Sequence, residues 1–108
     1  MKHYLLVESQ GAFASADASQ FFALARALAA SGNKVEILLI ENGVMAARTG
    51  AKADDLATTL KAGIPIMADE FAMRERALAR NALLRGVNAA AIGTVIERMA
   101  DGWNIVWH

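Results

Sequence analysis

Short apolar runs alternate with segments of helical spacing along the whole chain, and this alternation restricts its fold more than any other feature. Apolar runs occupy residues 4–7, 35–40 and 64–67, and only the second contains a charged residue, Glu36. Runs of this length between turn residues are typical of strands that are buried on both faces. The connections between runs are too short to form separate domains. The pattern therefore predicts a mainly parallel sheet covered by helices on both faces.

The expected architecture is a three-layer α/β/α domain that spans residues 1–108 as one unit. We expect five strands, at residues 3–9, 35–40, 64–67, 87–92 and 103–107. Helices are expected at residues 16–30, 54–61, 70–79 and 94–100, with a helical turn at 44–48 and a short turn at 81–84. Pro65 cannot donate to a sheet ladder, so the third strand is predicted to be short or irregular.

Composition excludes several classes of function. The 108 residues suit one domain, and 56% hydrophobic content is enough to form a core. The formal net charge of zero argues against nucleic acid as a partner, because phosphate binding needs a surplus of Lys and Arg. The chain has no cysteine, which excludes disulfides, thiol catalysis and cysteine-ligated metals. A chain this small cannot bury so much apolar surface alone, so we expect a homo-oligomer.

No targeting or membrane segment is expected. The apolar run near the N-terminus stops at Glu8 and is too short for the core of a signal peptide. No apolar stretch approaches the length that crosses a bilayer. We therefore expect a cytoplasmic protein that does not bind membranes.

The segment at residues 63–74, Gly-Ile-Pro-Ile-Met-Ala-Asp-Glu-Phe-Ala-Met-Arg, is expected to be a strand, a tight loop and the first turn of a helix. Asp69 follows the apolar run, where a carboxylate can cap the unpaired N–H groups of a helix. The carboxyl end of a strand in an α/β sheet is also where ligands bind. Asp69 is thus either a helix cap or a residue of a binding site.

Other polar residues are expected near Asp69, because the carboxyl ends of parallel strands meet at one edge of a sheet. The candidate ligand-binding residues are Ser9, Gln10, Glu41, Asn42, Asp69, Glu70, Arg74 and Thr94. Arg74 can reach back to Glu70 four residues earlier. The alternative is that these residues only cap helices and form turns, as any α/β domain requires.

No catalytic residue, metal site or cofactor is expected. His3 and His108 are the two imidazoles and should lie at opposite ends of the sheet, too far apart to share a metal or a triad. The glycine spacings of a dinucleotide fingerprint or a P-loop do not occur. An enzyme that uses Asp69 or Glu70 as a base is the least favoured alternative. Trp103 and Trp107 are expected to be core or interface anchors.

The segment at residues 63–74, with Leu-Leu-Arg-Gly-Val at 83–87 and Glu-Asn-Gly-Val at 41–44, resembles the DsrE family of small sulfur-relay proteins. The resemblance implies a five-stranded α/β domain that assembles as trimers or hexamers. Active members carry a persulfide on a cysteine of this loop, for tRNA thiolation or sulfur oxidation. Asp69 stands where that cysteine would be.

Because a carboxylate cannot hold a sulfane sulfur, the resemblance implies a non-catalytic subunit, or a protein that binds a partner in a sulfur relay. The alternative is a small-ligand-binding protein that uses the polar residues at the carboxyl ends of the strands.

Overall fold

A computed structural model describes residues 1–11 and 16–108, which contain a five-stranded sheet of order β4-β3-β2-β1-β5. All four strand pairs are parallel, which confirms the predicted fold class. The strands are β1 (His3–Glu8), β2 (Lys34–Leu39), β3 (Ile66–Asp69), β4 (Val87–Ala90) and β5 (Asn104–Trp107).

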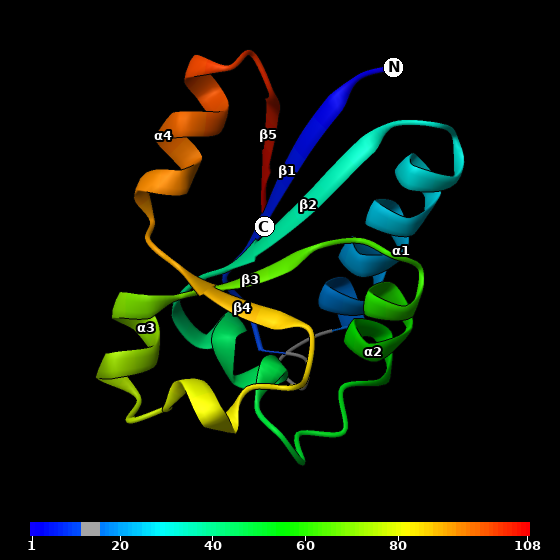
Figure 1. Ribbon diagram of the computed structural model, residues 1–108. Coiled ribbons are helices and arrows are strands. Elements are labelled where there is room, and N and C mark those ends of the chain that lie inside the picture. Colours follow the sequence, from blue (N-terminus) through cyan, green and yellow to red (C-terminus); the bar gives the residue numbers. More distant parts are fainter. Residues whose placement is uncertain (12–15) are drawn as a thin grey trace.

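Helices cover the two faces of this sheet unequally. The α-helices are α1 (Ala16–Ala30), α2 (Asp54–Lys61), α3 (Glu70–Glu75) and α4 (Gly93–Ala100). Two 3-10 helices, η1 (Glu41–Ala47) and η2 (Arg80–Ala82), lie in the connections. Figure 1 shows α1 and α2 on one side of the sheet and α4 on the other, while α3 lies near the carboxyl end of β3.

The alternation of side chains along β1 divides the core into two clusters. Leu6 points to the larger cluster, with Phe22 of α1, Leu56 of α2 and residues of η1. Leu5 and Val7 point to the smaller cluster. Its other buried residues are Leu38 of β2 and Val95 of α4. The sequence therefore forms a thick layer on the α1–α2 side and a thin one on the α4 side.

The third strand was predicted two residues too early. It spans Ile66–Asp69 instead of residues 64–67, and Pro65 lies just before it. The missing N–H of Pro65 costs no ladder bond there, while its carbonyl accepts a hydrogen bond of 2.9 Å from the amide of Ile37. The later start places Asp69 at the last position of the strand, directly before α3.

The helix predicted at residues 70–79 was too long. α3 ends at Glu75, and Ala77 adopts the left-handed region with φ 53°. The amide of Leu78 then bonds back to the carbonyl of Met73 at 2.9 Å, which closes the helix end. Phe71, in the first turn of α3, is 58% exposed.

The other boundaries differ by a few residues. The strands predicted at 87–92 and 103–107 are Val87–Ala90 and Asn104–Trp107, and the helical turn predicted at 44–48 is η1, which begins at Glu41. No helix in the two described ranges is long and apolar enough to cross a membrane.

Candidate functional site

Asp69 caps the helix that follows it, as the sequence predicts. Its Oδ2 accepts a hydrogen bond of 3.0 Å from the amide of Ala72, and its backbone is extended, as an N-cap residue requires. Asp69 is only 6% exposed because it closes the inner strand β3. The residue that stands in place of the expected cysteine therefore has a structural task.

Asp69 also lines a hollow of about 300 Å³ at the carboxyl edge of the sheet, which we call the acidic groove. The groove is lined by Ile40, Glu41, Asp69, Phe71, Ala72, Glu75 and Ile92. Four of these side chains are apolar and three are carboxylates. An apolar hollow with a few convergent polar groups is the usual form of a binding site.

The segment that contributes Glu41 to the groove is held in a constrained conformation. Glu41 has φ 48°, in the left-handed region that costs a non-glycine residue about 1–2 kcal/mol. The amide of Gly43 donates to the carbonyls of Ile40 at 2.8 Å and Ser9 at 3.1 Å. A Cβ at Gly43 would lie 2.3 Å from the carbonyl oxygen of Glu8, so only glycine allows this approach.

Glu70 and Arg74 lie in a different hollow from Asp69. This hollow, of about 230 Å³, is also lined by Met73, Leu78 and Arg80. Glu70 forms its ion pair with Arg80, so the predicted pairing with Arg74 was wrong. The reason is the early end of α3, because the chain turns back after Glu75 and places Arg80 beside Glu70.

Asn42 holds an arginine instead of facing the acidic groove. Its side-chain oxygen accepts two hydrogen bonds from Arg76, at 3.1 Å from Nε and 2.9 Å from Nη2. The same guanidinium lies 3.7 Å from Glu75 and donates to the carbonyl of Ala72 at 3.2 Å. Arg76 thus joins η1 to the end of α3 and fixes one wall of the groove.

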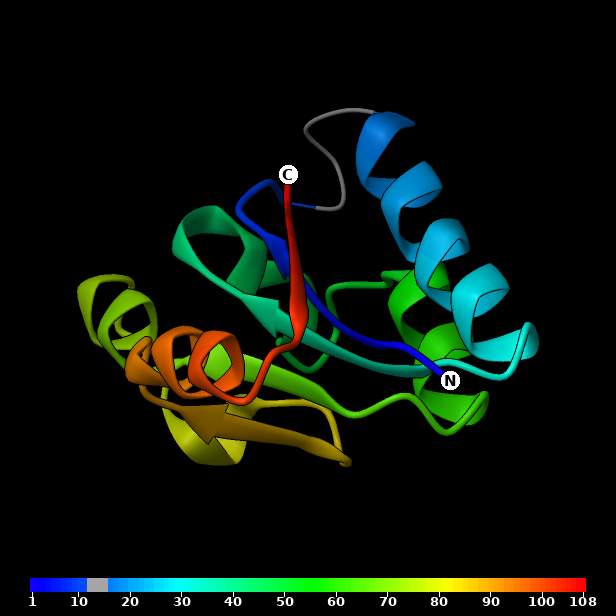
Figure 2. The same ribbon diagram turned by 90° about the horizontal axis from the view of Figure 1, so that it is seen from above.

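Ser9 and Gln10 lie in neither hollow but beside the fully buried carboxylate of Glu8. Glu8 ends β1 with no exposed surface, and its Oε2 lies 2.8 Å from Nδ1 of His108. Its Oε1 accepts 2.8 Å from the amide of Gln10, while the hydroxyl of Ser9 donates to the carbonyl of His108 at 2.8 Å. Figure 2 shows the end of β5 beside the end of β1.

Sequence reasoning placed His3 and His108 correctly at opposite ends of the sheet but did not find the Glu8–His108 pair. The His108 ring also stacks on Phe21 of α1, with centroids 5.1 Å apart. The available signal was Glu8 itself, a charged residue that directly continues a buried apolar run. A charge at such a position usually has a partner when it is buried.

The eight candidate residues therefore do not form one pocket. Glu41 and Asp69 share the acidic groove, Glu70 and Arg74 share the second hollow, and Ser9 and Gln10 surround Glu8. Asn42 binds Arg76. Thr94 lies in the first turn of α4, where its amide donates to the carbonyl of Ala91 at 3.0 Å. Among residues 1–11 and 16–108, no three His, Cys, Asp or Glu side chains gather as metal ligands.

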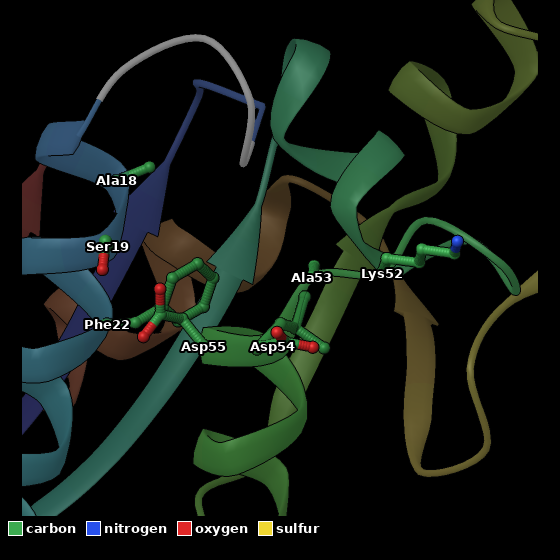
Figure 3. A pocket seen from close by; sticks show the side chains of 8 residues that line it. Ala18, Ser19, Phe22, Lys52, Ala53, Asp54 and Asp55 are labelled. Atoms are coloured by element: carbon green, nitrogen blue, oxygen red, sulfur yellow. The ribbon is translucent and has the colours of Figure 1, made fainter.

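A further hollow of about 190 Å³ lies between the starts of α1 and α2 (Figure 3). Its lining includes Phe22, Lys52, Asp54 and Asp55, and sequence reasoning did not anticipate it. Asp54 and Asp55 lie in the first turn of α2, whose N-cap is Ala53, without a side-chain hydrogen bond. Asp55 instead lies 3.6 Å from Arg26, which links α2 to α1.

The fold and the loop around Asp69 define a class of protein, the parallel five-stranded α/β domains with a strand–loop–helix site at the carboxyl edge of the sheet. A family model described as DsrE/DsrF-like matches residues 2–107, so the chain belongs to that family. It is a member without any cysteine. None of the curated proteins matches the sequence significantly.

Solved structures share the fold at low sequence identity. The ychN protein from E. coli aligns with TM-score 0.88 and 16% identity over 100% of both chains. MTH1491 from Methanobacterium thermoautotrophicum, a protein of unknown function, aligns with TM-score 0.84 and 17% identity over 99% of this chain and 98% of that one. BT1422 from Bacteroides thetaiotaomicron, also of unknown function, gives 0.75 and 17% over 97% and 94%. At such identities the likeness concerns the fold alone.

Proposed function

We propose that this chain is a non-catalytic subunit of a DsrE-type assembly in the cytoplasm, which binds a sulfur-carrying partner and carries no sulfur itself. Membership of the family and the complete absence of cysteine support this proposal. The observation that carries it is the role of Asp69. At the position expected for the cysteine, the carboxylate of Asp69 caps α3 by accepting a hydrogen bond of 3.0 Å from the amide of Ala72.

The cap explains how the loop keeps its shape without the sulfur chemistry. An N-cap side chain satisfies a backbone N–H that would otherwise lack a partner, and this stabilises a helix of only six residues. The strand–loop–helix geometry therefore persists with a carboxylate in place of a thiol. A subunit of this kind can still present the family's surface to its partners.

Assembly as a homo-oligomer, a trimer or hexamer by resemblance, is part of the proposal. Ile92, Ile96 and Met99 are spaced i, i+4, i+7 and are all exposed, Ile96 by 71%. We call these three residues the α4 apolar stripe. Trp107, 58% exposed, pairs with Val7 of the smaller cluster and so lies on the same side of the sheet. Exposed apolar patches of this kind mark interaction sites.

Light scattering coupled to size exclusion tests the assembly. We expect a mass of three or six chains at tens of micromolar, and a lower mass for Ile96→Asp, which places a charge in the centre of the stripe. Arg85→Asp, at an exposed position outside the stripe, is the matched control. A native chain that elutes as a monomer would contradict this part of the proposal.

The partner role is tested with the chain's own relatives. Co-expression with a cysteine-bearing DsrE-family protein from the same genome should give a complex that survives gel filtration. Genomic neighbours that encode sulfur carriers or tRNA-modifying enzymes would supply the candidates. If none of these candidates forms a complex, the proposed role in a sulfur relay fails.

The variant Asp69→Cys tests whether the loop retains the geometry of a sulfur-carrying site. Position 69 lines the acidic groove, so a thiol there is within reach of a small persulfide donor. The thiolate would attack the outer sulfur and release the donor thiolate, which leaves a protein persulfide. Mass spectrometry should find one added sulfur atom in Asp69→Cys and less in the exposed control Arg80→Cys. Equal transfer to both variants would limit the relation with active members to the fold.

Binding of a small ligand is the second candidate function, favoured by the apolar and acidic lining of the groove. A thermal-shift screen with metabolites tests it, because a ligand at a hundred times its dissociation constant stabilises a protein by about 2.7 kcal/mol. A shift that disappears in Phe71→Ser would locate the ligand in the groove. A screen without any such shift would leave this candidate without support.

A further inference from the structure

The acidic groove exposes apolar side chains that a monomer gains nothing by exposing. Phe71 is 58% exposed and Ile92 is 48% exposed, and both line the groove with Ile40 and Ala72. Phe71 belongs to the first turn of α3, and Ile92 directly precedes α4. The groove therefore continues into the α4 apolar stripe through Ile92, which belongs to both.

The charges in the groove are all negative. Glu41, Asp69 and Glu75 are the charged residues of its lining, and the lining contains no Lys or Arg. Arg76 lies 3.7 Å from Glu75 but donates its shortest hydrogen bonds to Asn42. Arg76 therefore offsets part of the negative charge of Glu75 only. An occupant with a positive charge and an apolar body would complement this lining.

The size of the groove restricts its occupant further. About 300 Å³ is at the lower limit of pockets that enclose small-molecule ligands, and the hollow opens widely to solvent. One long side chain of a docked protein suits such a space better than a cofactor does. Buried anchors of this kind supply much of the energy at protein interfaces, and arginine is prominent among them.

We propose that the acidic groove receives an arginine side chain from a partner protein. The aliphatic stem would lie along Ile40 and Ile92, and the guanidinium would stack on Phe71. The planar head forms paired hydrogen bonds with carboxylates, and the lining of the groove offers those of Glu41, Asp69 and Glu75. Which protein supplies the arginine rests on the proposed function; the chemistry of the groove does not.

Two synthetic peptides test the chemistry. Both are acetylated and amidated octapeptides with leucines around a central residue, which is arginine in one and citrulline in the other. Citrulline keeps the shape but removes the charge. By NMR titration of the native protein we expect the arginine peptide to bind at least roughly tenfold more tightly and to weaken with added salt. Its shifts should centre on Phe71, Glu75 and Ile92.

Single substitutions locate the interaction. Phe71→Ser and Glu75→Gln change exposed side chains, so the fold should persist, and each should weaken the arginine peptide several-fold. Glu97→Gln removes an exposed carboxylate of α4 outside the groove and should leave binding unchanged. Equal binding of the two peptides, or shifts centred outside the groove, would overturn the proposal. So would a native oligomer in which a second copy covers Phe71 and excludes the peptide.

The same variants separate this inference from the proposed function. If a DsrE-family partner binds Phe71→Ser and Glu75→Gln as tightly as it binds the native chain, the arginine site is wrong and the subunit role stands. If the arginine peptide binds in the groove but no DsrE-family partner forms a complex, the site stands and the sulfur-relay role fails.

Discussion

Helices cover the two faces of the sheet to different extents. On one side α1, α2 and η1 bury Phe22, Leu56 and Val44 in a continuous cluster. On the other, α4 alone covers five strands, whose width is about 19 Å at the usual strand spacing, with a helix about 10 Å across. α4 is anchored by Val95 and by Arg98, which binds Glu36 of β2 at 2.9 Å.

We infer from this difference that the two sides of the sheet have different roles. The α1–α2 side closes its own core, so its side chains determine whether the chain folds. The α4 side leaves an apolar stripe open, and this stripe meets the acidic groove of the carboxyl edge at Ile92, so these side chains are available for other molecules. Five substitutions measure this contrast, beginning with the largest expected effect.

Phe22→Ala should be the most damaging change, because Phe22 is 2% exposed in the larger cluster. Deleting a buried phenylalanine ring removes its transfer free energy and leaves a cavity, at a cost of about 3–5 kcal/mol. Urea denaturation followed by circular dichroism measures the loss. A cost below that of every groove variant would break the contrast between the two sides.

His108→Ala should cost about 1–3 kcal/mol, because it leaves the fully buried carboxylate of Glu8 without its side-chain partner. The double variant Glu8→Leu with His108→Ala should recover part of that loss, since no charge then remains buried. Denaturation of the single and double variants checks this. Additive losses would mean that the pair contributes nothing as a pair.

Asp69→Ala should cost about 0.5–2 kcal/mol through the lost cap of α3, and Asp69→Asn should cost less because asparagine also caps. The melting temperatures of the two variants provide the measurement. If neither variant melts below the native protein, the cap is not the reason for this residue, and a purely functional role gains ground.

Glu41→Gly should stabilise the protein by about 1 kcal/mol, because glycine adopts the left-handed conformation of this position without strain. Ala77→Gly is the matched control, since Ala77 has φ 53° but lies outside the groove. Both should raise the midpoint of denaturation by similar amounts. Only Glu41→Gly should weaken the arginine peptide, because strain at a site is retained where its side chain has a function.

Ile96→Ser should have the smallest effect on folding, within about 0.5 kcal/mol, because this side chain is 71% exposed on α4. Denaturation at submicromolar concentration, where subunit contacts contribute least, is the appropriate measurement. A loss as large as that of His108→Ala would show that α4 supports the core more than its exposure indicates.

Much of the fold could be predicted because its causes are local. Apolar runs between turn residues located all five strands within about two residues. The position of Asp69 after such a run indicated a helix cap as one of two roles, and its bond to Ala72 confirms that role. Both signals arise from neighbours in the sequence. The length of α3 was predicted wrongly because the left-handed residue that follows this helix is Ala77, and the usual sequence signal for that conformation is a glycine.

The candidate site was less predictable because its causes lie far apart in the chain. The strand order β4-β3-β2-β1-β5 places β5 beside β1, and only this brings Glu8 within 2.8 Å of His108 across a hundred residues. In the same way, the turn after α3 places Arg80 in an ion pair with Glu70 and leaves Phe71 exposed in the groove that Ile92 also lines.

The sequence by itself determined that this protein is a parallel α/β domain of the DsrE type and that its loop has a carboxylate instead of a thiol. Periodicity and residue identity decide these points, because backbone hydrogen bonding and side-chain chemistry act over a few residues. Tertiary structure alone decided which polar residues meet, which carboxylate is buried and which face stays open. Those properties depend on the packing of distant segments, and no local pattern encodes it.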